Sequence, residues 1–324
     1  MVPGRAAAVA AVVALAALYC TTTEAQLFPA RPVRIVVALA PGGGTDNLTR
    51  IIAPKLSELL GQLFVVENRA GAGGQIGSDF VAKSPADGYT LLNTDTSFAS
   101  NPSLFAKLPY DSVKDFSPVS LLASAPVALI IHPSVPAKTL QELLALAKAR
   151  PKLFNFAMGG FGSATHLAVE QFRAASKIDI VVIPYKGGGP ATVDVLAGQV
   201  VMMFGGPSSL AQHVATGRLR ALAVTGSKPI PALPDVPTFL ASGLPAVDAG
   251  SYWGSLAPAA TPREVVNALS TAMMTTLQMP DVRQRLIALG YEPLGSTPEE
   301  FAANLRSEMA KWAKAAKAAK IRVE

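Results

Sequence analysis

The chain has 324 residues, of which half are hydrophobic and 15% are charged, and its formal net charge is +6. This composition excludes an intrinsically disordered chain, because so many apolar side chains can form a sizeable core. The positive charge is modest, and no block of Lys and Arg is interleaved with aromatic residues, which disfavours a nucleic-acid-binding protein.

The first residues predict an export signal. A positively charged start precedes the apolar run 6–18, and small residues up to Ala25 fit a cleavage site. The run is shorter than the roughly 20 residues that a membrane-spanning helix needs. We expect residues 1–25 to be removed, the mature chain to begin at Gln26, and the protein to be soluble in the periplasm. Cleavage would also remove Cys20, the only cysteine.

Two segments of the chain share one order of elements, which indicates an internal repeat. The first covers residues 35–84 and the second residues 154–199. In each, an apolar run leads through a glycine-rich turn, a threonine and a polar residue into an amphipathic helix. A second apolar run and a second glycine-rich turn follow. Short apolar runs that alternate with helical periods predict parallel βαβ units, so we expect an α/β fold with two lobes.

Each repeat contains two glycine-rich loops that lead into helices. Glycine costs ordering entropy, so three in a row suggest backbone that must approach another group closely. Open α/β sheets bind ligands at the carboxyl ends of their strands, and helix N-termini there offer free N–H groups to anions. We therefore expect the four loops to bind a small anion in a cleft between the lobes. The candidate residues are Pro41, Gly42, Gly43, Gly44, Thr45, Asp46, Ala70, Gly71, Ala72, Gly73 and Gly74 in the first repeat, and Gly160, Ser163, Thr165, His166, Tyr185, Gly187 and Gly188 in the second.

The polar side chains of these loops have two open roles each. Asp46 either caps its helix and orders the loop, or faces the cleft and meets a ligand ammonium. His166 holds the matching place in the second repeat, where it either starts the helix or donates to an anion. Thr45, Ser163 and Thr165 can serve as helix caps, as ligand donors, or as both.

The rest of the chain also fits two lobes. An apolar strand over residues 127–131 separates the repeats, and a buried strand over residues 217–225 follows the second one. We expect the chain to cross between the lobes at these two strands. Residues 26–124 and 226–324 would then form lobe 1, and residues 125–225 would form lobe 2.

Catalytic patterns are missing from the sequence. The three histidines have no partners at metal-ligand spacing, no G-x-S-x-G elbow occurs, and no complete dinucleotide or P-loop motif is present. We therefore expect a binding protein without a metal or a cofactor. The alternative from another class is an exported α/β enzyme that acts on a small anionic substrate, although no nucleophile–base pair can be assembled from the residues.

Several motifs occur in one order along nearly the whole mature chain and resemble the tripartite tricarboxylate transporter substrate-binding proteins, often called Bug receptors. They are residues 40–46 (APGGGTD), 66–74 (VENRAGAGG), 86–91 (ADGYTL), 108–111 (LPYD), 184–188 (PYKGG) and 253–258 (WGSLAP). The resemblance implies a type II periplasmic binding-protein fold and a small carboxylate or amino-acid ligand that both lobes hold. It also implies that residues 41–46 and 70–74 grip a carboxylate, largely through backbone donors and ordered waters.

The same resemblance implies a partner and raises one doubt about the ligand. The partner would be a two-subunit secondary transporter in the inner membrane, and we expect the receptor itself to be a monomer. Relatives often read Met-Phe-Asp after the strand 200–204, where this chain has Gly205, Gly206 and Pro207. The lost carboxylate counts against an amino-acid ligand without excluding one. A sensory binding protein that feeds a signalling partner stays open as an alternative role.

Overall fold

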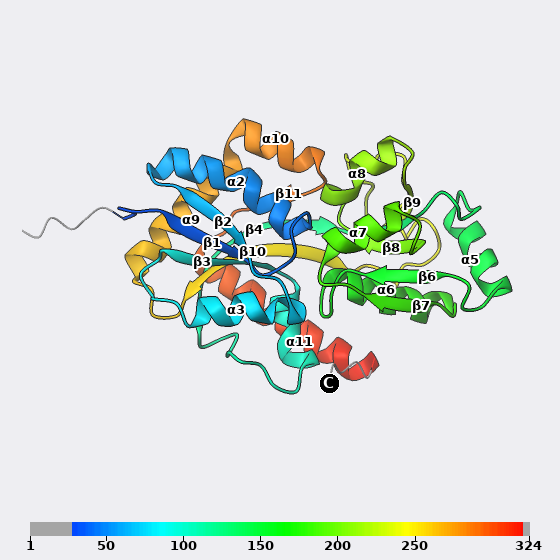
Figure 1. Cartoon of the computed structure of the whole chain (residues 1–324), viewed down its shortest axis with the longest axis horizontal. Coiled ribbons are helices and arrows are strands. Elements are labelled where there is room, and N and C mark those ends of the chain that lie inside the picture. The colour runs from blue at the N-terminus through cyan, green and yellow to red at the C-terminus, as the bar shows by residue number, and fades with distance from the viewer. Residues whose placement is uncertain (1–27, 320–324) are drawn as a thin grey trace, which may run out of the picture.

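The structure, a computed structural model, describes residues 28–319. The predicted signal peptide and Cys20 lie outside the described residues. Figure 1 shows two lobes, each a sheet with helices on both faces, lying side by side along the long axis. In the described part of the chain, no helix combines the length and the apolar character that crossing a membrane requires.

The first lobe contains a six-stranded sheet in the order β11-β4-β10-β3-β1-β2. Strand β1 runs parallel to its neighbours β2 and β3, whereas β10 is antiparallel to β3 and β4. The strands are β1 (Val33–Val37), β2 (Phe64–Asn68), β3 (Thr90–Asp95), β4 (Phe116–Pro126), β10 (Gly250–Pro258) and β11 (Glu292–Pro293). The helices are α2 (Gly44–Leu60), η1 (Ala72–Gly74), α3 (Gln75–Ala82), α4 (Ser97–Leu104), α9 (Arg263–Gln278), α10 (Pro280–Ala288) and α11 (Pro298–Ala319).

The second lobe contains a five-stranded sheet in the order β7-β6-β8-β5-β9. Strand β6 is parallel to β7 and β8, and β5 is antiparallel to β8 and β9. The strands are β5 (Ala128–Ile131), β6 (Asn155–Met158), β7 (Val181–Pro184), β8 (Met202–Gly205) and β9 (Arg220–Val224). The helices are α5 (Leu140–Ala149), α6 (Ala164–Ser176), α7 (Gly188–Leu196) and α8 (Pro207–Ala215).

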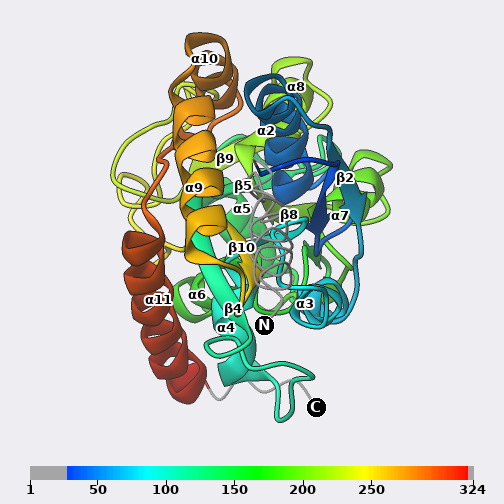
Figure 2. The same ribbon diagram turned by 90° about the vertical axis from the view of Figure 1, so that its left-hand side faces the viewer.

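Helices cover both faces of each sheet, so strands such as β5 (ALII) are apolar along their whole length. Successive strand residues point to opposite faces, so Ile35 packs in one core cluster of lobe 1 and Val36 in the other. Helices α2, α9 and α10 cover the first face, and α3, α4 and α11 cover the second (Figure 2). In lobe 2, Leu129 and Ile130 divide in the same way between a cluster under α5 and α6 and a cluster under α7 and α8.

The internal repeat read from the sequence corresponds to matching units of the two lobes. The unit β1–α2–β2 ends in a parallel strand pair, and so does the unit β6–α6–β7. The predicted two-lobe α/β fold is therefore confirmed. In both lobes the glycine-rich turns follow the carboxyl ends of parallel strands, which brings them to the edges of the two sheets that face each other (Figure 1).

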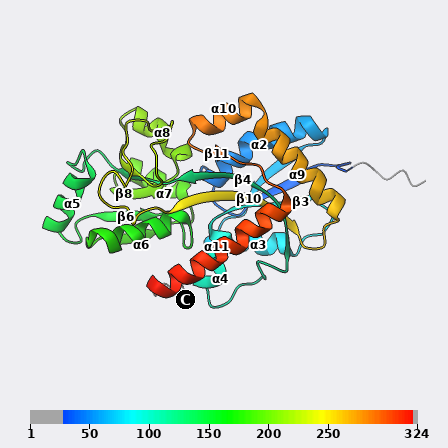
Figure 3. The same ribbon diagram turned by 180° about the vertical axis from the view of Figure 1, so that it is seen from behind.

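Two connections join the lobes. The chain leaves β4 at Pro126 and enters β5 at Ala128, and it returns to the first sheet in β10, as the view from behind shows (Figure 3). Residues 226–249 pack on lobe 2, because Phe239 and Val247 belong to its core cluster. This packing leads us to propose the second crossover near residue 249 instead of residue 226. From the sequence these residues are expected in lobe 1, because the strand 217–225 is taken there as the crossing point.

Candidate ligand-binding site

The turn between β1 and α2 is built from glycines that have different reasons to be there. Gly42 has a φ of +77°, a conformation that favours glycine. Gly43 caps α2 and offers no side-chain acceptor. A Cβ on Gly44 would lie 2.7 Å from Cζ2 of Trp253, so glycine allows this buried indole ring to pack against the helix start. The first N–H groups of α2 are thereby left without a capping side chain.

Asp46 braces this turn from within the protein. Its carboxylate accepts hydrogen bonds from the N–H of Gly42 at 3.0 Å, from Nε of Arg50 at 3.0 Å and from Nδ2 of Asn68 at 2.9 Å. Burial alone would raise the pKa of the Asp46 carboxyl, but these hydrogen bonds together lower it. Of the two roles left open by the sequence, the contacts of Asp46 are those of a residue that orders the loop.

His166 repeats this arrangement in the second lobe. Its Nδ1 accepts the N–H of Gly162 at 3.1 Å, and Gly162 has a φ of +74°. Both bracing residues therefore hold the amide of the glycine four positions earlier. Burial lowers the pKa of His166, which favours the neutral ring that can accept a hydrogen bond. Helix α6 is capped by Ser163, whose Oγ accepts the N–H of His166 at 3.2 Å.

Replacing Asp46 by asparagine is expected to lower the free energy of unfolding by about 1.5–3 kcal/mol at neutral pH, the size typical of hydrogen bonds to a charged group. Asparagine would turn an amide NH2 toward the N–H of Gly42. The lowered pKa of Asp46 means that its contribution is present above the ordinary value of 3.8 and is lost as the pH falls below it. Urea unfolding between about pH 7 and pH 2.5 measures both effects.

The two unfolding curves should therefore converge in acid, whereas parallel curves at all pH values would contradict the role of the Asp46 charge. Asp46 does not line either of the cavities described below. Ligand preference should consequently be the same in the Asp46→Asn variant and in the wild type.

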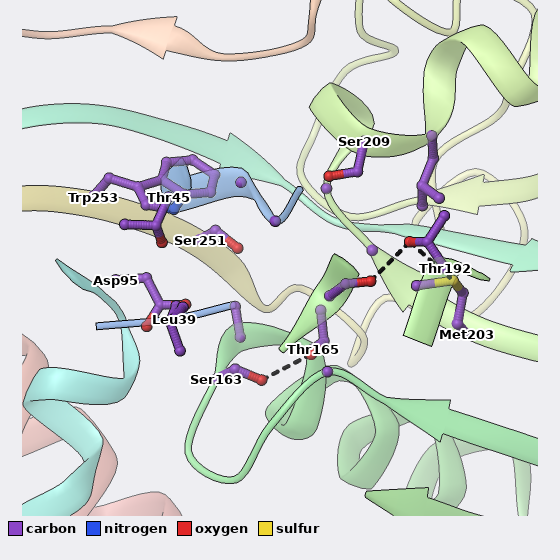
Figure 4. Close-up of a pocket in the computed structure, with 18 residues that line it drawn as sticks. Leu39, Thr45, Asp95, Ser163, Thr165, Thr192, Met203, Ser209, Ser251 and Trp253 are labelled. Atoms are coloured by element: carbon purple, nitrogen blue, oxygen red, sulfur yellow. Dashed lines mark hydrogen bonds between the residues drawn. The ribbon is translucent and has the colours of Figure 1, made fainter. Parts of the chain in front are cut away.

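A cavity of about 60 Å³, here called the polar cavity, lies between the lobes. Helices α2, α6, α7 and α8 all begin at it, and Figure 4 shows how their residues converge. Lobe 1 contributes Leu39, Gly43, Gly44, Thr45, Asp95, Ser251 and Trp253, and lobe 2 contributes Gly159, Ser163, Ala164, Thr165, Gly188, Thr192, Met203, Gly205, Gly206, Ser209 and Leu210.

Three of the helices that begin at the polar cavity have no capping side chain. The cap residues of α2, α7 and α8 are Gly43, Gly187 and Gly206, none of which offers a side-chain acceptor. The Thr45 hydroxyl is buried and has no partner among the described residues. An unpaired buried polar group costs about 1–3 kcal/mol, and helix N-termini favour negative charge. The cavity is thus suited to an anion that accepts several hydrogen bonds.

A second cavity of about 290 Å³ adjoins the first and shares Leu39, Gly159 and Ser163 with it. Its other lining residues are Ala72, Gly73, Ser97, Gly160, Phe161, Pro184, Tyr185 and Lys186. The hydroxyl of Tyr185 donates to Oδ2 of Asp194 at 2.7 Å. Burial and this carboxylate raise the pKa of Tyr185 to about 12. The ring of Tyr185 therefore forms a fixed part of the wall.

The lobes contact each other around the polar cavity. Oγ of Ser209 donates to the carbonyl oxygen of Gly42 at 3.2 Å, and Oγ of Ser100 donates to that of Gly162. A Cβ on Gly189, at the start of α7, would overlap the carbonyl oxygen of Pro41. The lobes are therefore closed on one another, and glycine at position 189 permits this approach.

The structure brings ten of the eighteen candidate residues to the two cavities. The candidates that line the polar cavity are Gly43, Gly44, Thr45, Ser163, Thr165 and Gly188. The candidates that line the adjoining cavity are Ala72, Gly73, Gly160, Ser163 and Tyr185. The others, which line neither cavity, are Pro41, Gly42, Asp46, Ala70, Gly71, Gly74, His166 and Gly187. Of the five candidates in the loop after β2, Ala72 and Gly73 line the adjoining cavity.

The sequence reasoning missed several residues of the polar cavity. Asp95 ends the parallel strand β3, so the rule that ligands bind at carboxyl ends of strands could have found it. Ser251 and Trp253 lie on β10, where Trp253 is paired with Asp95. Gly205 and Gly206 were noted only as a departure from a motif, yet they lead into α8 at the cavity.

The comparison with family models agrees with this geometry. A model described as the tripartite tricarboxylate transporter family receptor matches residues 48–321. The chain belongs to this family. The resemblance read from the sequence motifs is thus confirmed, and the family consists of receptors, that is, of binding proteins.

Solved structures of similar proteins support the same assignment for this receptor. The periplasmic binding protein BugD is 34% identical with a TM-score of 0.88, and the match covers 91% of the receptor and 100% of BugD. A protein of R. palustris solved with adipate has the same identity, TM-score and coverage. MatC from Rhodopseudomonas palustris, solved with bound malate, is 34% identical with a TM-score of 0.83, over 89% of the receptor and 99% of MatC.

Proposed function

We propose that this receptor is an exported binding protein that captures a small carboxylate in the periplasm and delivers it to a tripartite tricarboxylate-type secondary transporter. The observation that carries the proposal is the meeting of four helix N-termini at one cavity with the Thr45 hydroxyl, which is unpaired among the described residues. The adipate and malate found in two similar structures are small carboxylates of the kind proposed.

The chemistry of a carboxylate fits these groups. A carboxylate is ionised at neutral pH and accepts about four hydrogen bonds but donates none. Hydrogen bonds to a charged group contribute roughly 1.5–3 kcal/mol each. Because α2 comes from one lobe and α6, α7 and α8 from the other, a bound carboxylate would link the lobes. Closure of the lobes around the ligand follows from this division of donors.

Binding is favoured over catalysis by the contacts of Ser163, one of the hydroxyl-bearing residues that line the site. The Ser163 hydroxyl bonds to the carbonyl of Gly160, to Thr165 and to the backbone N–H of His166. The imidazole of His166 is instead engaged with Gly162. Within the described residues, no base activates Ser163, so we propose that the receptor is not an enzyme.

The location and the partners are parts of the same proposal. Removal of residues 1–25 would release the mature chain into the periplasm. The similar protein BugD is described as a periplasmic binding protein. The partner would be a pair of inner-membrane transporter subunits, and the receptor would act as a monomer. Loss of uptake of the labelled ligand in a deletion strain would support transport, whereas a changed transcriptional response with normal uptake would support the sensory alternative.

Calorimetric titration of the purified mature chain tests the binding function. The ligands are acetate, succinate, malate, adipate and citrate, each compared with its amide at about pH 7. At least one acid should bind with a Kd in the micromolar range or below, and its amide should bind about 100-fold more weakly or not at all. The acid should be recovered unchanged by mass spectrometry. Turnover of the acid would support the enzyme, and equal binding of acid and amide would contradict the anion site.

A further inference from the structure

One charged side chain lines the polar cavity among the described residues, and it is an acid. Asp95 ends β3 and is paired across the sheet with Trp253 of β10. The remaining lining is made of backbone, hydroxyl groups and apolar side chains. A negative charge is unexpected in a cavity whose helix N-termini favour anions, so the position of Asp95 requires an explanation.

The local contacts of Asp95 do not neutralise it. Oδ1 accepts hydrogen bonds from the N–H of Ser97 at 2.9 Å and from the Ser97 hydroxyl at 2.6 Å, just before α4. No Lys, Arg or His of the described chain forms an ion pair with Asp95, and burial raises the pKa of its carboxyl. The contacts to Ser97 account for Oδ1, but they leave a partly buried charge at the cavity without a positive partner, which is unfavourable.

The cavity therefore has two ends of different character. Figure 4 shows Asp95 on the side of Thr45 and Trp253, across the cavity from Thr192 and Ser209. The far side carries Thr192 of α7 and Ser209 of α8, near the starts of two helices that favour an anion. The start of α2 with Thr45 lies on the side of Asp95. A ligand with one positive and one negative group would match both ends, whereas a plain dicarboxylate would bring a second negative charge toward Asp95.

We propose that Asp95 is a specificity-determining residue that makes the receptor prefer carboxylates bearing an ammonium group, that is, amino acids, over the corresponding plain organic acids. The inference rests on the proposed function and names its ligand class. The ammonium lies at Asp95, and the carboxylate lies between the start of α2 in lobe 1 and the helix starts of lobe 2.

Matched ligand pairs test this assignment. Succinate with aspartate, butyrate with 2-aminobutyrate, and adipate with 2-aminoadipate differ only by the ammonium group, and calorimetry at about pH 7 gives the Kd of each. Wild-type receptor should bind the amino member of the best pair about 10- to 100-fold more tightly, the range for a hydrogen bond to a charged group. In the Asp95→Asn variant, the two members of the pair should bind about equally well, or the plain acid should bind more tightly. Asparagine keeps an acceptor for Ser97 but removes the negative charge.

Asp87→Asn is the matched control. Oδ1 of Asp87 accepts the N–H of Tyr89 two residues on at 3.0 Å, as Oδ1 of Asp95 does for Ser97, but Asp87 is exposed and pairs with Arg31. The control should keep the wild-type preference. Wild-type binding of the plain acid as tight as that of the amino acid would overturn the assignment, as would an equal loss for both ligands in Asp95→Asn. Failure of every carboxylate to bind would instead overturn the proposed function.

Discussion

Gly189→Val is expected to weaken ligand binding by at least about 100-fold while leaving the unliganded receptor folded. A side chain at this position would overlap the carbonyl oxygen of Pro41 in the other lobe. The atoms nearest to this side chain belong to the backbone of Pro41 and Gly42, which cannot move aside as a flexible side chain could. The lobes of the variant should therefore stay apart, and the ligand would lose at least two hydrogen bonds, each worth about 1.5–3 kcal/mol.

The unliganded protein should tolerate Gly189→Val because the overlap disappears when the lobes separate. Calorimetry gives the affinity, and small-angle scattering gives the radius of gyration with and without ligand. The wild-type radius should shrink on binding, and that of the variant should not. Val193→Ala is the control, since Val193 is an exposed residue of the same helix α7. Binding by Gly189→Val within about threefold of the wild type would show that closure at this contact is not required.

Thr45→Val should change stability and affinity in opposite directions. The Thr45 hydroxyl is buried without a partner in the described structure, so replacing it by a methyl group should raise the free energy of unfolding by about 1 kcal/mol. The same change removes one donor to the ligand carboxylate, which should weaken binding about tenfold or more. A residue that is only structural would not produce this pair of opposite effects.

Thr276→Val separates the two effects. Thr276 lies on α9, and its hydroxyl is likewise buried and unpartnered among the described residues, but it does not line either cavity. This control should gain similar stability in urea unfolding and keep wild-type affinity. If Thr45→Val also keeps wild-type affinity, the carboxylate does not reach the start of α2.

The repeat and its turns could be predicted because they are local. A strand, a glycine-rich turn and a helix are read from neighbouring residues, and Asp46 and His166 occupy matching places in both the sequence and the structure. Their bracing role was not decided by the sequence, since it depends on the left-handed turns at Gly42 and Gly162. A capping acid and a ligand-binding acid have the same sequence signature.

Two residues of the site, Ser251 and Trp253, come from long-range strand pairing. Trp253 reaches the cavity because β10 inserts between β3 and β4 after the chain has passed through the whole second lobe. No periodicity in the sequence encodes that pairing. The loop after β2 is shaped by the short helix η1. Gly74 there lies against Ala38, and Ala72 and Gly73 line the adjoining cavity.

A crystal structure of the receptor with the tightest ligand of the calorimetric panel tests the central claim most directly. We predict that the ligand carboxylate lies between the lobes with its oxygens about 2.7–3.2 Å from N–H groups at helix starts of the polar cavity and with a hydrogen bond from the Thr45 hydroxyl. A carboxylate bound outside this cavity, or one held by a single lobe without contact to these helix starts, would contradict it.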